Sequence, residues 1–91
     1  MTAELFLPGS RSLKDKRVVL RKVRDHLSNR CGATVAEVGY QDLWQRSQVV
    51  FAVAASNLGV LAKALDGGRA VLDGNDWVLV STREEVIEVD A

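Results

Sequence analysis

The segment Gln48 to Ala55, with the sequence Gln-Val-Val-Phe-Ala-Val-Ala-Ala, constrains the fold more than any other part of the chain. Its apolar residues do not alternate with polar ones, so both faces of a strand formed by this segment are apolar. Such a strand is typical of the middle of a sheet. We therefore expect residues 48–55 to form a central strand, covered by helices on one side and by another polypeptide surface on the other.

The rest of the chain alternates between strand-like and helix-like patterns. Apolar and alternating stretches predict strands at 2–7, 34–41 and 77–82, and residues 86–90 either extend the last strand or form a further short one. Apolar residues at helical spacing predict a helix over residues 13–31 and a second helix that begins after Asn57.

Capping residues mark the ends of the predicted helices. Ser12 is a favourable N-cap with Asp15 three residues on, which makes an imperfect capping box, and Gly32 supplies a left-handed stop. The pair Gly67-Gly68 interrupts the second helical pattern at a cost of about 2 kcal/mol relative to two alanines. We expect this helix to break or kink at Asp66, with a turn over 73–76.

The resulting order, β-α-β-β-α-β, predicts an α+β fold of the ferredoxin-like class, built as one domain over residues 1–91. This sandwich has a four-stranded antiparallel sheet with two helices on one face. Right-handed crossovers place the first and third strands in the middle. The other sheet face has no helices, so we expect Phe51 or its neighbours to be covered there by a second copy of the chain, by the C-terminal segment, or by a ligand. A homo-oligomer through this open face is the favoured expectation.

The composition is that of a soluble globular domain, with 47% apolar and 26% charged residues in a chain of 91. No apolar run approaches the roughly 20 residues that span a bilayer, and no signal peptide pattern is visible, so we expect no membrane association. The single cysteine, Cys31, excludes an internal disulfide. These features suit a cytoplasmic location.

Charge is unevenly distributed although the formal net charge is zero. Residues 11–30 carry a net +6, and residues 66–91 carry a net −5. The basic candidates for binding a nucleic acid or another anion are Arg11, Lys14, Arg17, Arg21 and Arg24. Bases crowded at a helix N-terminus suit a phosphate. The alternatives are a solvated helix face, or neutralisation of the two charged segments by each other.

The stretch Gln41-Asp42-Leu43-Trp44-Gln45-Arg46 is unusually rich for a connection between two strands. One interpretation has Leu43 and Trp44 covering the sheet edge or an oligomer interface, while Asp42 and Arg46 pair or cap the turn. The other is a ligand clamp in which Trp44 stacks on a base and Arg46 holds a phosphate. The residues assigned to this interface or clamp are Asp42, Trp44, Arg46 and Phe51.

No catalytic constellation, metal site or cofactor motif is visible. His26 has no nearby nucleophile, Cys31 is expected to be a small buried side chain, and Glu37 with Asp42 makes no general-base pair without a cleft. The central strands lack the aromatic and basic residues of an RRM, which argues against stacking of RNA on the sheet face.

Three blocks of the sequence resemble the YlxP-like family of uncharacterised bacterial proteins, also called domain of unknown function 503. These blocks are Pro8-Gly9-Ser10-Arg11-Ser12-Leu13-Lys14-Asp15-Lys16-Arg17, Val35-Ala36-Glu37-Val38 and Gln41-Asp42-Leu43-Trp44-Gln45-Arg46. The resemblance covers residues 4–60 and weakens from Gly67 onward. It implies a ferredoxin-like fold and no established activity. Family genes often lie among those for translation initiation and ribosome maturation, which implies RNA or the ribosome as a partner.

These observations favour a small non-catalytic binding module that is RNA- or ribosome-associated through its basic first helix. An oligomeric scaffold or protein-interaction domain with no nucleic-acid role is the alternative. An enzyme or a metabolite sensor ranks last.

Overall fold

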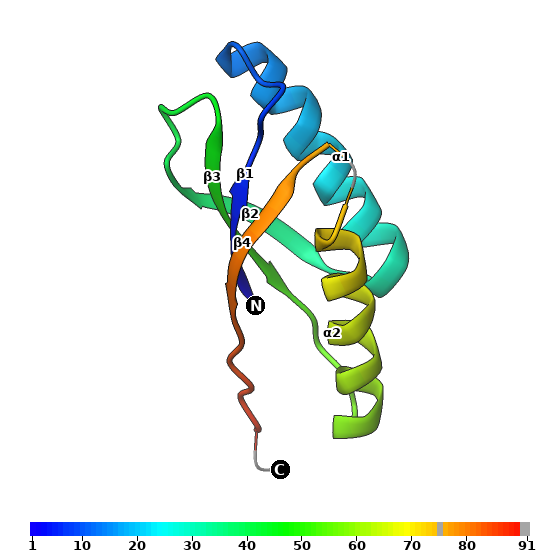
Figure 1. Cartoon of the computed structure of the whole chain (residues 1–91). Helices are drawn as coiled ribbons and strands as arrows, with labels where there is room; N and C mark the ends of the chain where they lie inside the picture. Colours follow the sequence, from blue (N-terminus) through cyan, green and yellow to red (C-terminus); the bar gives the residue numbers. More distant parts are fainter. Residues whose placement is uncertain (75, 90–91) are drawn as a thin grey trace.

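The computed structural model describes residues 1–74 and 76–89, which form one sheet and two helices (Figure 1). The elements in chain order are β1 (Thr2–Phe6), α1 (Leu13–Cys31), β2 (Thr34–Gly39), β3 (Arg46–Ala52), α2 (Leu58–Leu72) and β4 (Val78–Arg83). The predicted β-α-β-β-α-β order and the ferredoxin-like α+β fold are therefore confirmed.

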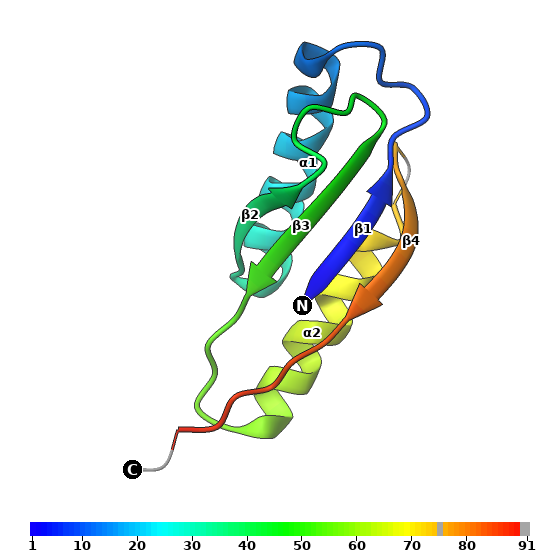
Figure 2. The ribbon, with the colours of Figure 1, turned by 90° about the vertical axis from the view of Figure 1, so that its left-hand side faces the viewer.

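The four strands are arranged in the order β2-β3-β1-β4, and each neighbouring pair is antiparallel. β1 and β3 occupy the middle, with Ala3 opposite Val49 and Leu5 opposite Ser47. Both helices lie on one face of the sheet, and the other face is open, as Figure 2 shows from that side. The prediction of a central third strand is thus confirmed.

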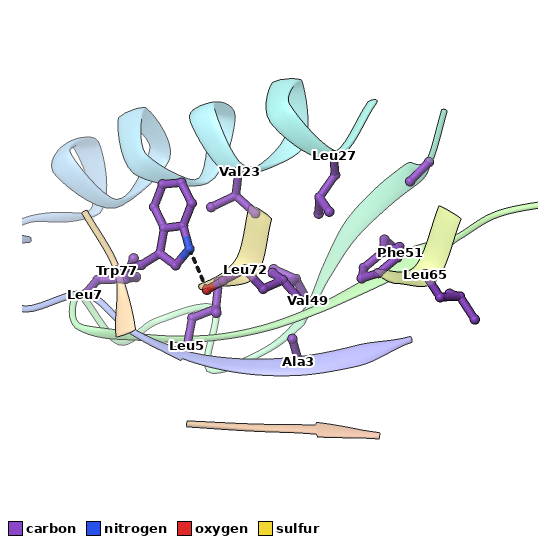
Figure 3. Close-up of a cluster of buried hydrophobic side chains, with 11 residues drawn as sticks. Ala3, Leu5, Leu7, Val23, Leu27, Val49, Phe51, Leu65, Leu72 and Trp77 are labelled. Atoms are coloured by element: carbon purple, nitrogen blue, oxygen red, sulfur yellow. Dashed lines mark hydrogen bonds between the residues drawn. The ribbon is translucent and has the colours of Figure 1, made fainter. Parts of the chain in front are cut away.

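The core fills the space between the sheet and the helices (Figure 3). Alternate residues of the two central strands point into it, and α1 contributes Val23 and Leu27. The buried apolar side chains are Ala3, Leu5, Leu7, Val23, Leu27, Ala33, Val49, Phe51, Leu65, Leu72 and Trp77. Because side chains alternate along a strand, the residues between them face the open side of the sheet.

Phe51 lies in this core and not on the open face, which corrects the expectation that it lines an interface or clamp. Its side chain is fully buried, and its ring packs against Gly68 of α2. On the open face, the strand neighbours of Phe51 are Val50 and Ala52, which are half-buried and exposed respectively. Within the described residues, no helix covers the open face of β3 (Figure 2).

The second helix runs without interruption from Leu58 to Leu72, so the expected break at Asp66 does not occur. Asn57 caps it as predicted, and its Oδ1 accepts a hydrogen bond of 2.9 Å from the Val60 amide. A glycine is needed at position 68 because a β-carbon there would stand 2.5 Å from Phe51 Cζ. Close packing against the sheet, rather than chain breakage, accounts for Gly68.

The strand ends differ from the predicted bounds by a few residues. β3 begins earlier than expected, at Arg46, and ends at Ala52, while β2 ends at Gly39. Trp77 precedes β4 and is buried, and its Nε1 donates a 3.0 Å hydrogen bond to the Leu72 carbonyl. Residues 86–89 form no strand, and the remainder of the predicted 86–90 segment lies outside the described residues, as does Asn75 of the predicted turn.

Candidate functional site

Two connections meet at the end of the molecule where α1 begins. The β1–α1 connection (residues 7–12) and the β2–β3 connection (residues 40–45) lie side by side in both views (Figures 1 and 2). The Leu7 amide donates a 2.8 Å hydrogen bond to the Gln45 carbonyl. The first basic residues of α1 therefore lie at the same end as the β2–β3 connection, which we call the Trp44 loop. These two features were identified separately in the sequence.

Lys16 anchors the second connection from within α1. Only 2% of its side chain is exposed. Its Nζ lies 2.8 Å from Glu37 Oε2 and donates a 2.6 Å hydrogen bond to the Tyr40 carbonyl. Ser47, itself buried, donates a 2.6 Å hydrogen bond to the same Glu37 oxygen. A buried ammonium group needs such partners, because leaving it unpaired is costly.

Gln45 fastens the two connections together. Its Nε2 donates to the Ser10 carbonyl at 3.1 Å and to the Pro8 carbonyl at 3.3 Å. Ser10 is 1% exposed, and its hydroxyl donates to the Ser12 carbonyl. Trp44 precedes Gln45 and Arg11 follows Ser10, so this clamp brings the backbones of an aromatic residue and a base to the same end of the fold.

The tip of the Trp44 loop is exposed. Leu43 is 47% exposed and Trp44 is 53% exposed, so about half of each side chain has no cover within one chain. A shallow depression of about 360 Å³ runs over residues 42–46. The Leu43 amide bonds to the Tyr40 carbonyl at 3.0 Å, which closes the turn. The interpretation that Leu43 and Trp44 cover the sheet edge or an oligomer interface stays a prediction.

Arg46 is engaged with neighbours on the open face and not with Asp42. Its guanidinium lies 3.0 Å from Glu4 Oε2 and 5.0 Å from the centroid of the Tyr40 ring. Tyr40 has a φ of 58°, and a hydrogen bond to Glu4 together with that carboxylate's charge raises the pKa of its phenol, which Arg46 opposes. Asp42 is exposed and forms no ion pair among the described residues.

Of the five predicted basic residues, four lie on α1 and Arg11 lies in the connection before it. Arg11, Lys14, Arg17, Arg21 and Arg24 are all exposed. Arg24 lies 3.6 Å from Asp25, whereas Lys14, Arg17 and Arg21 form no ion pair within residues 1–74 and 76–89. We call Lys14, Arg17 and Arg21 the basic stripe. Among the described residues, one ion pair joins the basic segment 11–30 to the acidic segment 66–91, between Lys22 and Asp76 at 3.0 Å.

The N-terminus of α1 is already capped by its own side chains. Ser12 Oγ accepts a 3.0 Å hydrogen bond from the Asp15 amide, and Asp15 Oδ2 accepts one from the Arg11 amide. The Asp15 carboxylate also complements the positive end of the helix dipole. This cap pairs the Asp15 amide, and the Asp15 carboxylate opposes an anion at the helix end, so anion binding here relies chiefly on the basic side chains.

The structure brings Arg11, Lys14 and Trp44 to one end, while Arg21 and Arg24 lie further along α1 and Phe51 lies in the core. The residues that hold this site, Lys16, Gln45 and Tyr40, were not among the predicted site residues. A lysine on the edge of an apolar stripe was the available signal for Lys16.

A second depression, of about 480 Å³, lies between the last turns of α1 and α2. His26 and Trp77 line it, with their ring centroids 6.3 Å apart. Among the described residues, no group of three or more His, Cys, Asp or Glu side chains is placed to hold a metal ion. Neither helix of the described chain has the length and apolar character needed to cross a membrane.

Comparison with known proteins identifies a family for this chain. A family model described as "Protein of unknown function (DUF503)" matches residues 1–84. The "Uncharacterized protein YlxP" of Bacillus subtilis (strain 168) is 33% identical over 70 residues, which make up 77% of this chain and 76% of that protein. The resemblance to the YlxP-like family is confirmed, and neither name states an activity.

Proposed function

The chain belongs to the family described as protein of unknown function (DUF503), and we propose that it is a small non-catalytic module that binds RNA through the basic stripe of α1. The observation that carries this proposal is that Lys14, Arg17 and Arg21 are exposed and form no ion pair among the described residues. Like charges on one helix face repel each other, and bound phosphates would relieve that repulsion.

The distribution of acidic residues supports the proposal. The C-terminal acidic segment does not neutralise the stripe, because its described contacts reach α1 at Lys22 and not at Arg17 or Arg21. The stripe begins at the end of α1 that lies beside the β2–β3 connection, where Trp44 is 53% exposed, so a bound polyanion could contact both bases and an aromatic side chain (Figures 1 and 2). Bases together with an aromatic residue are typical of RNA-binding surfaces. Association with the ribosome and a cytoplasmic location would follow from such a role.

Salt dependence tests the proposal directly. With three phosphate contacts, one for each base of the stripe, affinity for a fluorescently labelled single-stranded RNA should fall roughly 20-fold between 50 and 200 mM salt. The double variant Arg17→Glu/Arg21→Glu should weaken binding at every salt concentration. Binding that is absent, or that salt leaves unchanged, refutes the proposal.

The matched control is Lys63→Glu/Arg83→Glu, which makes the same change in net charge at exposed residues outside α1. If RNA binds through the stripe, the control keeps most of the wild-type affinity. An equal loss in both double variants would show that net charge, and not the stripe, governs binding.

A second candidate function is an oligomeric scaffold that assembles through the open sheet face. Three exposed valines on the two edge strands favour it: Val38, Val78 and Val80 are each about half exposed, at 51%, 54% and 51%. Val78 lies opposite Phe6 on that face. A Val78→Glu variant with a smaller mass in light scattering than the wild type would support the scaffold, and a monomeric wild type would rule it out.

A further inference from the structure

We propose that the Trp44 loop receives an unpaired base of single-stranded RNA, which stacks on the Trp44 indole while Arg11 and Lys14 contact the adjacent phosphates. This inference rests on the proposed RNA-binding function and names the kind of RNA and the residues that select it. Trp44 is 53% exposed at the tip of a connection that hydrogen bonds to the rest of the fold hold in place.

The loop is fixed although its tip is exposed. Lys16 bonds the Tyr40 carbonyl at one end of the connection, and Gln45 bonds the Pro8 and Ser10 carbonyls at the other. The hydrogen bond from the Leu43 amide to Tyr40 closes the turn between them. An aromatic side chain on a fixed loop loses little conformational freedom when it binds a ligand, which favours stacking.

α1 and the connection before it carry basic residues at the same end of the fold as the Trp44 loop (Figures 1 and 2). The Ser10 carbonyl accepts a hydrogen bond from Gln45. Arg11 follows Ser10 in the chain and Trp44 precedes Gln45, so both residues adjoin this contact. Lys14 lies one turn further on, is exposed, and has no ion-pair partner among the described residues. Arg11 and Lys14 are thus the exposed bases at this end of the fold, and they are the proposed contacts for the phosphates that flank a stacked base.

Arg46 is a poorer phosphate ligand than the clamp interpretation of the sequence assumed. Its guanidinium is already shared between the Glu4 carboxylate and the Tyr40 ring. A phosphate at Arg46 would have to compete with Glu4 and would meet that carboxylate's negative charge. Trp44 therefore keeps the stacking role of the clamp interpretation, and Arg11 and Lys14 replace Arg46 as the contacts for the phosphates.

Stacking on an indole requires a base whose face is accessible. In a duplex, neighbouring base pairs cover both faces of each base, whereas the bases of single strands and loops can be splayed onto aromatic side chains. Leu43, 47% exposed beside Trp44, widens the apolar surface that such a base would meet. A duplex would contact the basic stripe alone.

The experiment compares wild-type protein with a Trp44→Ala variant, using an oligouridylate and an RNA duplex of equal phosphate number. Trp44→Ala should weaken binding of the oligouridylate about 5- to 150-fold, which corresponds to the loss of one stacked base, and should leave duplex binding unchanged. A Trp44→Phe variant, which keeps an aromatic ring, should recover part of the loss. Leu43→Ala, which removes an exposed apolar neighbour, should cost less than Trp44→Ala.

Tryptophan fluorescence gives an independent readout because Trp77 is buried and Trp44 is exposed. The oligouridylate should quench the exposed indole, whereas heparin, a polyanion without bases, should bind without quenching. Equal losses for single strand and duplex, or no effect of Trp44→Ala, would overturn this inference and leave the proposed function intact. Absence of binding to any RNA would refute both. A change of mass in light scattering for Trp44→Ala would instead assign the loop to a protein interface and overturn the inference.

Discussion

The ring of Phe51 lies against the backbone of Gly68, so closely that a β-carbon at position 68 would stand 2.5 Å from Phe51 Cζ. This contact joins the central strand β3 to the middle of α2. It determines how near the helix approaches the sheet, and it explains why a helix that runs unbroken to Leu72 contains a glycine there.

We predict that Gly68→Ala destabilises the protein. Alanine at an interior helical position is favoured over glycine by up to about 1 kcal/mol, but overpacking against a fully buried ring costs about 1–3 kcal/mol. The net result should be a free energy of unfolding lower by about 1–2 kcal/mol, measured by urea denaturation.

Gly67→Ala is the matched control on the neighbouring residue. A β-carbon at position 67 would meet Arg30 Cγ at 3.4 Å, an ordinary contact with a flexible side chain. The gain in helix propensity should then dominate, and the free energy of unfolding should rise by about 0.5–1 kcal/mol. A stabilised Gly68→Ala variant would show that Phe51 moves aside easily.

The sequence predicted the order of the elements because each carries a local signal. Ser12 and Asn57 are caps, Gly32 adopts the left-handed conformation expected of a helix stop, and the apolar run in β3 required a central place. The behaviour of Gly67-Gly68 could not be predicted in this way. Glycine lowers helix propensity in any setting, and only the packed structure reveals that Phe51 occupies the space beside one of the two.

The second prediction concerns the buried ammonium group of Lys16. Replacing it in Lys16→Met removes the partner of Glu37 and of the Tyr40 carbonyl while keeping an unbranched side chain. Removing one member of a buried ion pair costs about 3–5 kcal/mol, and the partial exposure of Glu37 reduces this to about 2–3 kcal/mol. Thermal or urea denaturation should report the loss.

Lys22→Met supplies the comparison for Lys16→Met. Lys22 also pairs with an acid, Asp76, but both side chains are about half exposed, at 52% and 51%. Surface pairs of this kind contribute less than about 1 kcal/mol. If the two variants lose similar stability, the contacts around Lys16 do not have the structural importance that its burial indicates.

The candidate site was predictable in its residue types but not in its partners. Trp44 and the bases of α1 stood out because an exposed indole and a run of like charge are unusual. Pairings between distant residues, such as Arg46 with Glu4 or Gln45 with Ser10, depend on strand register and on the course of two connections. Nothing within the Gln41–Arg46 block distinguishes Asp42 from Glu4 as the partner of Arg46.

A third prediction uses the only tyrosine of the chain, whose titration is therefore free of overlap with other phenols. A hydrogen bond to Glu4, followed by the charge of Glu4, raises the pKa of Tyr40 above its ordinary value of 10.0. Glu4→Gln should lower this pKa, and it should also free Arg46 to stabilise the phenolate. Absorbance of the phenolate as a function of pH measures the change.

The raised pKa of Tyr40 also fixes the sign of a pH effect on stability. The folded protein holds the phenolic proton to higher pH than the unfolded chain does, so the contribution is complete below pH 10.0 and is lost as pH rises through the folded-state pKa. In Glu4→Gln this alkaline loss should become smaller. Equal phenol titrations in wild type and Glu4→Gln would contradict the assigned hydrogen bond.

The fourth prediction tests whether the hydrogen bonds of Gln45 hold the Trp44 loop in place. Gln45→Glu keeps the shape of the side chain but replaces the donor Nε2 with an oxygen, which cannot bond the Pro8 and Ser10 carbonyls. The unfolding free energy should fall by about 1–3 kcal/mol, because two acceptors lose their partner and face a carboxylate. Amide hydrogen exchange should become faster in both connections.

Gln41→Glu is the control within the same loop. The exposed Gln41 Nε2 makes a single long contact of 3.4 Å to the Glu37 carbonyl, so this variant should change stability by less than about 0.5 kcal/mol. If Gln41→Glu and Gln45→Glu loosen the loop equally, added negative charge is responsible and the clamp on Pro8 and Ser10 is not.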